Sequence, residues 1–154
     1  MQSPLTGPTA DLGLLLARLM LSIVFVWSGA DKLTHWSEAV SEVVSVGLPY
    51  PWLLLATTVV VQLGGGLSVA LGLFARLGAL LLMGFTVVAT VLFHAFWAVA
   101  DPVEHQRQLT TFLEHVAIVG GFTAVMFLGA GRFTWLRYIE RGPLKQSVRT
   151  RGQP

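Results

Sequence analysis

The chain has 154 residues, of which 54% are hydrophobic and only 12% are charged, whereas a soluble domain carries about 25% charged residues. This composition excludes an ordinary soluble globular protein and predicts one compact membrane domain; the net charge of +2 arises mostly near the C-terminus and gives no reason to expect a nucleic-acid partner. There is no cysteine, so the chain supplies neither a disulfide nor thiolate ligands for an iron–sulfur cluster, and any redox role requires a bound cofactor or a partner.

The N-terminal segment, residues 1–11, is polar and rich in proline, glycine, serine and threonine. No basic residue precedes Arg18, so the segment lacks the positive region with which a cleaved signal peptide begins. We expect these residues to form a disordered lead to the membrane domain.

Four apolar segments follow, each close to the roughly 20 residues that a helix needs to cross the hydrocarbon core. They occupy residues 12–29, 51–74, 77–98 and 110–130. The connection between the second and the third is so short that these two helices are expected to form a tight antiparallel hairpin. Residues 12–131 are therefore predicted to form an all-α transmembrane domain, an antiparallel four-helix bundle.

The longer connection between the first two segments has a helical pattern of its own. Trp36, Val40, Val43 and Val44 recur at helical spacing, with serine and glutamate at the positions between them. This amphipathic pattern predicts a short interfacial helix that lies on the membrane surface. Pro51 then suits the first turn of the next helix.

Basic residues predict the orientation of the spans. Arg76 and six basic residues within 132–154 lie on one side of the expected membrane, whereas only Lys32 and Arg107 lie on the other. The positive-inside rule then places both termini in the cytoplasm of a bacterium, with the chain as a multi-pass protein of the inner membrane. The basic tail, residues 132–154, is expected either to grip anionic headgroups or to dock a soluble partner.

Small residues recur every four positions on two of the spans. Gly64, Ser68 and Gly72 form a stripe on the second span, and Ala117 and Gly121 form a shorter one on the fourth. Small side chains let membrane helices approach one another closely, so both stripes are predicted to be helix contacts. Their spacing does not match a phosphate-binding glycine loop.

A few polar side chains interrupt the apolar spans, and such groups are costly enough in hydrocarbon to mark candidate functional sites. The rise of a helix places Arg18 and Gln62 deep in the membrane, where they form a candidate intramembrane polar pair. Alternatively, Arg18 snorkels toward the inner headgroups, and Gln62 makes only a hydrogen bond between helices.

A second group of polar residues is expected in the outer half of the membrane. It comprises Lys32, His94, Trp97, Glu114 and His115, which are predicted to converge in a pocket between facing helices. Simpler alternatives are an ion pair between Lys32 and Glu114 and histidines satisfied by local hydrogen bonds. Axial haem ligation by His94 and His115, or a metal site that adds Glu114, is compatible with the residue types, but no other haem or metal signature accompanies them.

Several short motifs, taken in order, resemble the DoxX family of small bacterial membrane proteins. The motifs extend over nearly the whole chain and are Arg18, Gly29-x-x-Lys32, Gly47-x-Pro49, Gly65-Gly66-Leu67, Gly72-Leu73-x-x-Arg76, His94, Gly120-Gly121 and Gly129-x-Gly131-Arg132. The resemblance implies a four-helix membrane bundle associated with membrane redox systems, either thiosulfate:quinone oxidoreduction or an oxidoreductase complex that acts in oxidant defence. Gln62 stands where the family often has an acidic residue, and Glu114-His115 stands where it commonly has Lys-Asn.

Three functions follow from these observations. The first, based on the resemblance, is a membrane subunit of a redox complex that binds quinone or quinol in the outer pocket, where Glu114 relays protons and Trp97 flanks the ring. Its partners would be other membrane or soluble oxidoreductase subunits, or further copies of the chain in a homo-oligomer. The second function is a non-enzymatic membrane anchor or scaffold for a partner protein. The third is a small proton or solute transporter whose path is lined by Arg18, Gln62 and Glu114.

Overall fold

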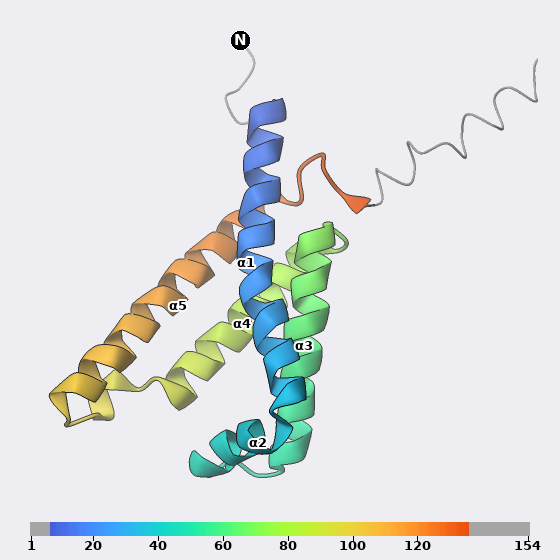
Figure 1. Ribbon diagram of the computed structural model, residues 1–154. Helices are drawn as coiled ribbons and strands as arrows, with labels where there is room; N and C mark the ends of the chain where they lie inside the picture. The colour runs from blue at the N-terminus through green and yellow to red at the C-terminus, as the bar shows by residue number, and fades with distance from the viewer. Residues whose placement is uncertain (1–6, 136–154) are drawn as a thin grey trace, which may run out of the picture.

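The computed structural model describes residues 7–135, so most of the predicted N-terminal lead and basic tail lies outside the described residues. Every regular element in this part of the chain is a helix (Figure 1). In chain order the helices are α1 (Pro8–Thr34), α2 (Trp36–Ser45), α3 (Pro51–Leu71), α4 (Ala75–Phe93), the short 3-10 helix η1 (Phe96–Ala98) and α5 (Pro102–Leu128). Four helical segments, α1, α3, α4 with η1, and α5, are long and apolar enough to cross a membrane. The predicted all-α fold with four spans is therefore confirmed.

The observed ends of the first two spans differ from the ends that hydropathy predicted. Residues 8–11 belong to α1 and are not disordered, because Pro8 occupies the first turn, where its missing N–H is not needed. The same helix continues past residue 29 to Thr34, since hydropathy marks only the most apolar part of a helix. At the end of α3, Gly72 adopts a left-handed conformation with φ 72°, which ends the helix before the predicted residue 74.

The last two spans also differ from the prediction, and this difference affects the site. α4 ends at Phe93, and the chain turns at His94 into η1, before the predicted boundary at residue 98. α5 begins at Pro102 rather than at residue 110, because Asp101 caps it: one carboxylate oxygen of Asp101 accepts a hydrogen bond from the Glu104 backbone N–H at 2.8 Å. The first two turns of α5 are polar, so a search for apolar segments missed them.

The four long helices meet in one apolar core toward the end where α3 ends and α4 begins. Phe25 of α1, Val69 of α3, Leu82 of α4 and Phe122 of α5 are all almost completely buried there. The ring centroids of Phe25 and Phe122 lie 5.4 Å apart, and the ring of Phe85 lies 6.3 Å from Phe25, edge-on to it. Tilted and edge-on contacts of this kind are the arrangements that aromatic rings prefer. This core fixes where the helices cross.

Away from this core the bundle divides into two helix pairs. Figure 1 shows α1 and α3 running together toward α2, while α4 and α5 lean away from them as a second pair. The short helix α2 packs on the first pair, because Ala39 and Val40 form a small second core with Leu55 and Val59 of α3. The helix predicted between the first two spans is therefore present, and its apolar face covers α3.

Two adjacent glycines of α3 lie where neighbouring helices approach it closely. A Cβ atom added to Gly66 would lie 2.8 Å from Val26 Cγ2 of α1, and one added to Gly65 would lie 2.8 Å from Leu82 Cγ of α4. Real Cβ atoms are not found this close to a neighbour. Both helices therefore approach α3 at positions where no side chain fits.

The predicted small-residue stripes coincide only in part with these contacts. Ser68 lies against Gly78 of α4, and Gly121 lies against Leu21 of α1. Gly64 instead faces open space, because the two glycines that follow it are the ones turned toward α1 and α4.

Leucine at Gly66 is expected to destabilise the bundle by about 1–3 kcal/mol, the usual cost of overpacking a core, because its side chain forces α1 away from α3. The matched control is Gly64→Leu, which places the same side chain in open space and is expected to change stability by less than about 0.5 kcal/mol. Unfolding in mixed micelles of increasing SDS content, followed by far-ultraviolet circular dichroism, measures both. Equal losses in the two variants would show that α1 and α3 do not depend on the close approach at Gly66.

Candidate functional site

Arg18 is buried and joins three parts of the chain. Its guanidinium donates hydrogen bonds to four backbone carbonyl oxygens: Val69 at 3.0 Å, Ala70 at 2.9 Å, Phe133 at 3.0 Å, and Ala130. The first two are in the last turn of α3, where the helix dipole is negative. The Val69 oxygen also accepts from the Gly72 backbone N–H at 3.2 Å. The other two follow α5. The side chain is 1% exposed, so it does not snorkel, and its contacts are those of a clamp between α1, α3 and the segment after α5.

Gln62 belongs to a separate network on the α1–α3 pair. Its Nε2 donates to Ser28 Oγ at 3.1 Å, and Lys32 Nζ donates to the same oxygen at 2.9 Å. The other amide atom of Gln62, Oε1, is buried and has no hydrogen-bond partner among residues 7–135. Because the described partners of Arg18 are all carbonyl groups and Gln62 binds Ser28, the structure does not bring Arg18 and Gln62 together as a pair.

His94 and His115 do come together, at the end of the α4–α5 pair where α4 ends and α5 begins. Their ring centroids lie 5.1 Å apart with an interplanar angle of 71°, an edge-to-face contact. His94 follows the last residue of α4, and His115 lies in the first half of α5. Both side chains are partly buried, so they remain accessible from one side.

Hydrogen bonds to Nδ1 fix the orientation of both rings. The Thr90 hydroxyl donates to the Thr86 carbonyl at 2.6 Å, so its oxygen accepts from His115 Nδ1–H at 2.7 Å. The Gln108 carbonyl oxygen accepts from His94 Nδ1–H at 2.8 Å. Because both rings carry their hydrogen on Nδ1, each Nε2 presents a lone pair when the ring is neutral. No hydrogen bond within residues 7–135 uses either Nε2.

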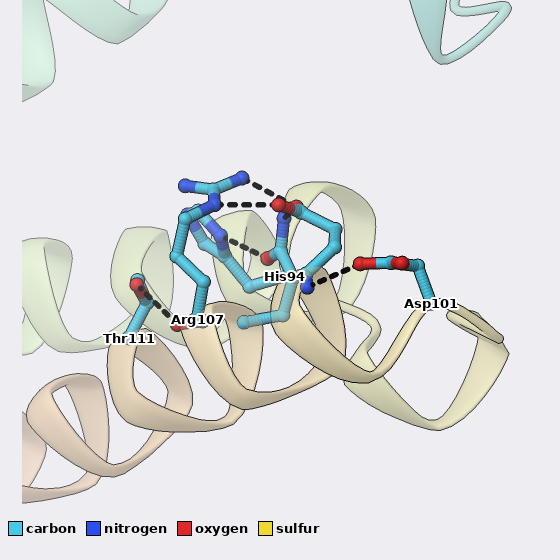
Figure 2. A network of polar contacts seen from close by, with 6 residues as sticks. His94, Asp101, Arg107 and Thr111 are labelled. Atoms are coloured by element: carbon cyan, nitrogen blue, oxygen red, sulfur yellow. Dashed lines mark hydrogen bonds and ion pairs between the residues drawn. The ribbon is translucent and has the colours of Figure 1, made fainter.

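A chain of polar groups holds Gln108 in this orientation. Its amide nitrogen donates to Glu104 Oε1 at 2.7 Å, which leaves its carbonyl oxygen facing His94. Figure 2 shows the network to which His94, Asp101 and Arg107 belong. Arg107 donates to both oxygens of Glu104, at 2.7 and 2.5 Å. Asp101 in turn binds the Glu104 backbone. Since an amide does not carry protons readily, these residues position His94 and do not form a proton path.

Aromatic side chains cover the same end of α4 and α5. Phe96 of η1 lies 5.2 Å from Phe112, 5.2 Å from Trp97 and 5.6 Å from His105, as distances between ring centroids. Trp97 is also within 6.5 Å of Phe112. The turn at the end of α4 therefore places an apolar aromatic wall near the histidine pair.

Of the five residues predicted for the outer pocket, the structure groups three at one end of the α4–α5 pair. These are His94, His115 and Trp97. Lys32 instead binds Ser28 on the α1–α3 pair. Glu114 is exposed, and among the described residues it makes neither an ion pair with Lys32 nor a hydrogen bond to the histidine pair.

Sequence reasoning missed Thr90, Glu104, Arg107 and Gln108. The signal for three of them was the helix start: an aspartate followed three residues later by a glutamate is a capping pattern, which predicts a helix from Pro102. A helix that starts there places three polar side chains on one face, because Gln108 lies four residues after Glu104 and His115 seven residues after Gln108. No sequence signal indicates that Thr90 faces His115.

The histidine geometry also bears on the haem and metal alternatives. Rings that touch edge to face leave no room for a macrocycle between them, so His94 and His115 do not fit as the two axial ligands of one haem. Within residues 7–135 no three histidine, aspartate or glutamate side chains cluster closely enough to hold a metal ion.

Comparisons with known proteins give a consistent result. The DoxX family model matches residues 13–95, which is more than half of the chain. Inner membrane protein YqjF of Escherichia coli K12 is 29% identical over 131 residues, which cover 85% of this chain and 95% of that protein. Inner membrane protein YphA of the same organism is 27% identical over 125 residues, with coverages of 81% and 89%. No solved structure matches the chain significantly. Together with the four spans, these inner membrane relatives confirm the predicted multi-pass localisation in that membrane.

Proposed function

The chain belongs to the DoxX family, and on that basis we propose that it is the integral membrane subunit of a membrane-associated redox complex, with a quinone-headgroup site at His94 and His115. One observation carries the site assignment: two imidazoles in contact, each oriented through Nδ1, each with Nε2 unused by the described residues. The redox assignment itself comes from the family resemblance.

The residues at this end of α4 and α5 have the chemistry that a quinone headgroup needs. A quinone carbonyl requires a hydrogen-bond donor and a quinol hydroxyl requires an acceptor; an imidazole Nε2 serves as either, according to its protonation. The aromatic wall of Phe96, Trp97 and Phe112 supplies apolar surface for the ring. A bound quinone supplies an acceptor for two electrons and two protons, and the electrons come from the partner oxidoreductase.

In this proposal the residues of the chain hold and move protons. His94 and His115 each donate or accept one proton at Nε2, while Thr90 and Gln108 keep the rings in place through Nδ1. Glu114, which the sequence suggested as a relay, is assigned no such role because it makes no hydrogen bond to either ring among the described residues.

We further propose that both termini face the cytoplasm and that the histidine pair opens toward the opposite side. The support is the distribution of basic residues: Arg76 and Arg132 lie at one end of the bundle, and five more basic residues follow in the sequence, as the positive-inside rule requires for a cytoplasmic end. Residues 132–154 then form a basic cytoplasmic tail.

A membrane scaffold is the second candidate function. It is favoured by how little of α5 is buried against the rest of the chain. Among the four spans, α5 has the smallest share of its surface buried within the chain. Leu113 and Val116 are more than half exposed, on either side of the exposed Glu114. A carboxylate on a lipid-facing helix is costly, so a partner that covers this face would stabilise it. A transporter has less support, because Arg18, Gln62 and the histidine pair belong to three separate networks among the described residues.

The experiment that tests the quinone site is extraction of the protein from its native membrane into lipid nanodiscs, followed by measurement of quinone relative to phospholipid. We expect several-fold enrichment of quinone over the bulk membrane, retained in His35→Leu and lost in the double variant His94→Leu, His115→Leu. His35 is a matched control, since it is an exposed histidine whose ring, among the described residues, makes hydrogen bonds to Thr34 and Asp31. A quinone content equal to that of the bulk membrane would overturn the assignment.

A further inference from the structure

A surface depression of about 640 Å³ lies at the end of α4 and α5 opposite to the histidine pair. The start of α4 forms one side of it, and the end of α5 with the segment that follows forms the other. Its lining includes Phe74, Arg76, Leu77, Leu128, Gly129 and Arg132, with Asp11 from α1. We call it the Arg76–Arg132 pocket. None of these residues takes part in the proposed quinone site.

The charged groups of this pocket leave it positive. Asp11 faces Arg132, whose backbone N–H donates to Oδ1 at 2.9 Å and whose Nε lies 3.9 Å from Oδ2. Arg76 makes no ion pair within residues 7–135. Two arginines against one aspartate thus leave a net charge of +1, and the guanidinium that carries the excess is that of Arg76.

The backbone around Arg76 orients its side chain toward the pocket. A Cβ atom added to Gly129 would lie 3.5 Å from both Nε and Nη2 of Arg76, so the guanidinium lies close over the backbone that ends α5. No side chain caps the N-terminus of α4, because Phe74 stands at the capping position. The N–H groups of the first turn therefore add to the positive potential that the two arginines create.

The rim of the pocket is apolar and exposed. Phe74 is 82% exposed, Leu77 56% and Leu128 52%. These residues lie where the apolar part of α4 begins and that of α5 ends, which is the depth at which lipid phosphates meet the hydrocarbon. A ligand that suits the pocket therefore combines a negatively charged phosphate with an apolar chain.

We propose that the Arg76–Arg132 pocket binds the headgroup phosphate of an anionic phospholipid, whose acyl chain lies against the apolar rim. Basic pockets between transmembrane helices are a known form of lipid recognition. Arg76 and Arg132 bind the phosphate, and Phe74, Leu77 and Leu128 contact the chain. The net positive charge favours an anionic lipid over a zwitterionic one with the same chains.

The test is a lipid titration of the full-length protein in detergent, followed by native mass spectrometry. Phosphatidylglycerol is compared with phosphatidylcholine of identical acyl chains, with and without millimolar inorganic phosphate. We expect the protein to bind phosphatidylglycerol more tightly than phosphatidylcholine. Either Arg76→Gln or Arg132→Gln is expected to weaken phosphatidylglycerol binding about fivefold, the effect of losing one basic residue near an anionic group. Arg76→Lys keeps the charge and is expected to retain most of the affinity.

The matched control is Arg107→Gln, which removes one exposed arginine at the opposite end of α5 and is expected to leave lipid binding unchanged. Circular dichroism shows which variants keep the helical fold, and only these are compared. Three results would each overturn the proposal. The first is equal binding of the two lipids. The second is unchanged phosphatidylglycerol binding in the double variant Arg76→Gln, Arg132→Gln. The third is full displacement of bound phosphatidylglycerol by inorganic phosphate, which would indicate a site for a soluble anion.

Discussion

Replacement of Arg18 by methionine is expected to lower the free energy of unfolding by on the order of 3–5 kcal/mol, because each hydrogen bond from a charged donor contributes about 1.5–3 kcal/mol and these contributions are not fully additive. Four carbonyl oxygens lose the guanidinium as a donor in this variant, and of these the Val69 oxygen keeps the bond from the Gly72 backbone N–H. Methionine retains the apolar contacts of the arginine stem but ends before the guanidinium. The loss is therefore mainly that of the guanidinium hydrogen bonds.

The location of Arg18 explains why no other group can replace it. Its partners lie at the end of α3 and after α5. Arg18 is 1% exposed, so little water reaches the carbonyl groups that it binds. The planar guanidinium carries five donors in a fixed arrangement, whereas the lysine ammonium has only three. Arg18→Lys is therefore expected to recover part of the stability but not all of it.

Unfolding in SDS-containing mixed micelles, followed by circular dichroism, measures these differences. The control is Arg107→Met, which removes an exposed arginine whose ion pair with Glu104 is at the surface and is expected to change the stability little. If Arg18→Met were as stable as the wild type, the four hydrogen bonds would not hold the helices together. Such a result would favour a role for Arg18 in function over one in stability.

The main features of the fold followed from the sequence because they depend on local patterns. Hydropathy alone predicted the four spans, and the amphipathic spacing of Trp36 and Val40 predicted α2. The ends of the helices were less predictable, because capping depends on single residues. Asp101 starts α5 within a polar stretch, and Gly72 ends α3 within an apolar one.

The candidate site was predicted only in part, because the pairing of helices is a property of the whole bundle. Depth in the membrane placed Lys32 beside His94, but α1 pairs with α3 and leaves Lys32 on the other side of the divided bundle. Depth likewise suggested that Arg18 meets Gln62. Backbone carbonyl groups at a helix end, which are the actual partners of Arg18, have no signature in a sequence.

The second large effect concerns the histidine pair. Alanine at both His94 and His115 is expected to lower the quinone-dependent turnover of the native complex at least about 100-fold, since positioned acid–base groups contribute about 10²–10⁴-fold to a rate. Each single substitution is expected to have a smaller effect, because the remaining imidazole still offers one Nε2 atom. Assembly is expected to persist, because the apolar core around Phe25 and Phe122 lies away from the pair.

The central claim is that the pair of imidazoles acts on the quinone, and turnover of the purified complex under saturating electron donor tests it most directly. The wild type is compared with the double alanine variant and with His35→Ala, which removes an exposed histidine outside the pair. We expect wild-type turnover for His35→Ala and loss of quinone-dependent turnover for the double variant, with both complexes fully assembled. Wild-type turnover in an assembled complex that lacks both His94 and His115 would contradict it.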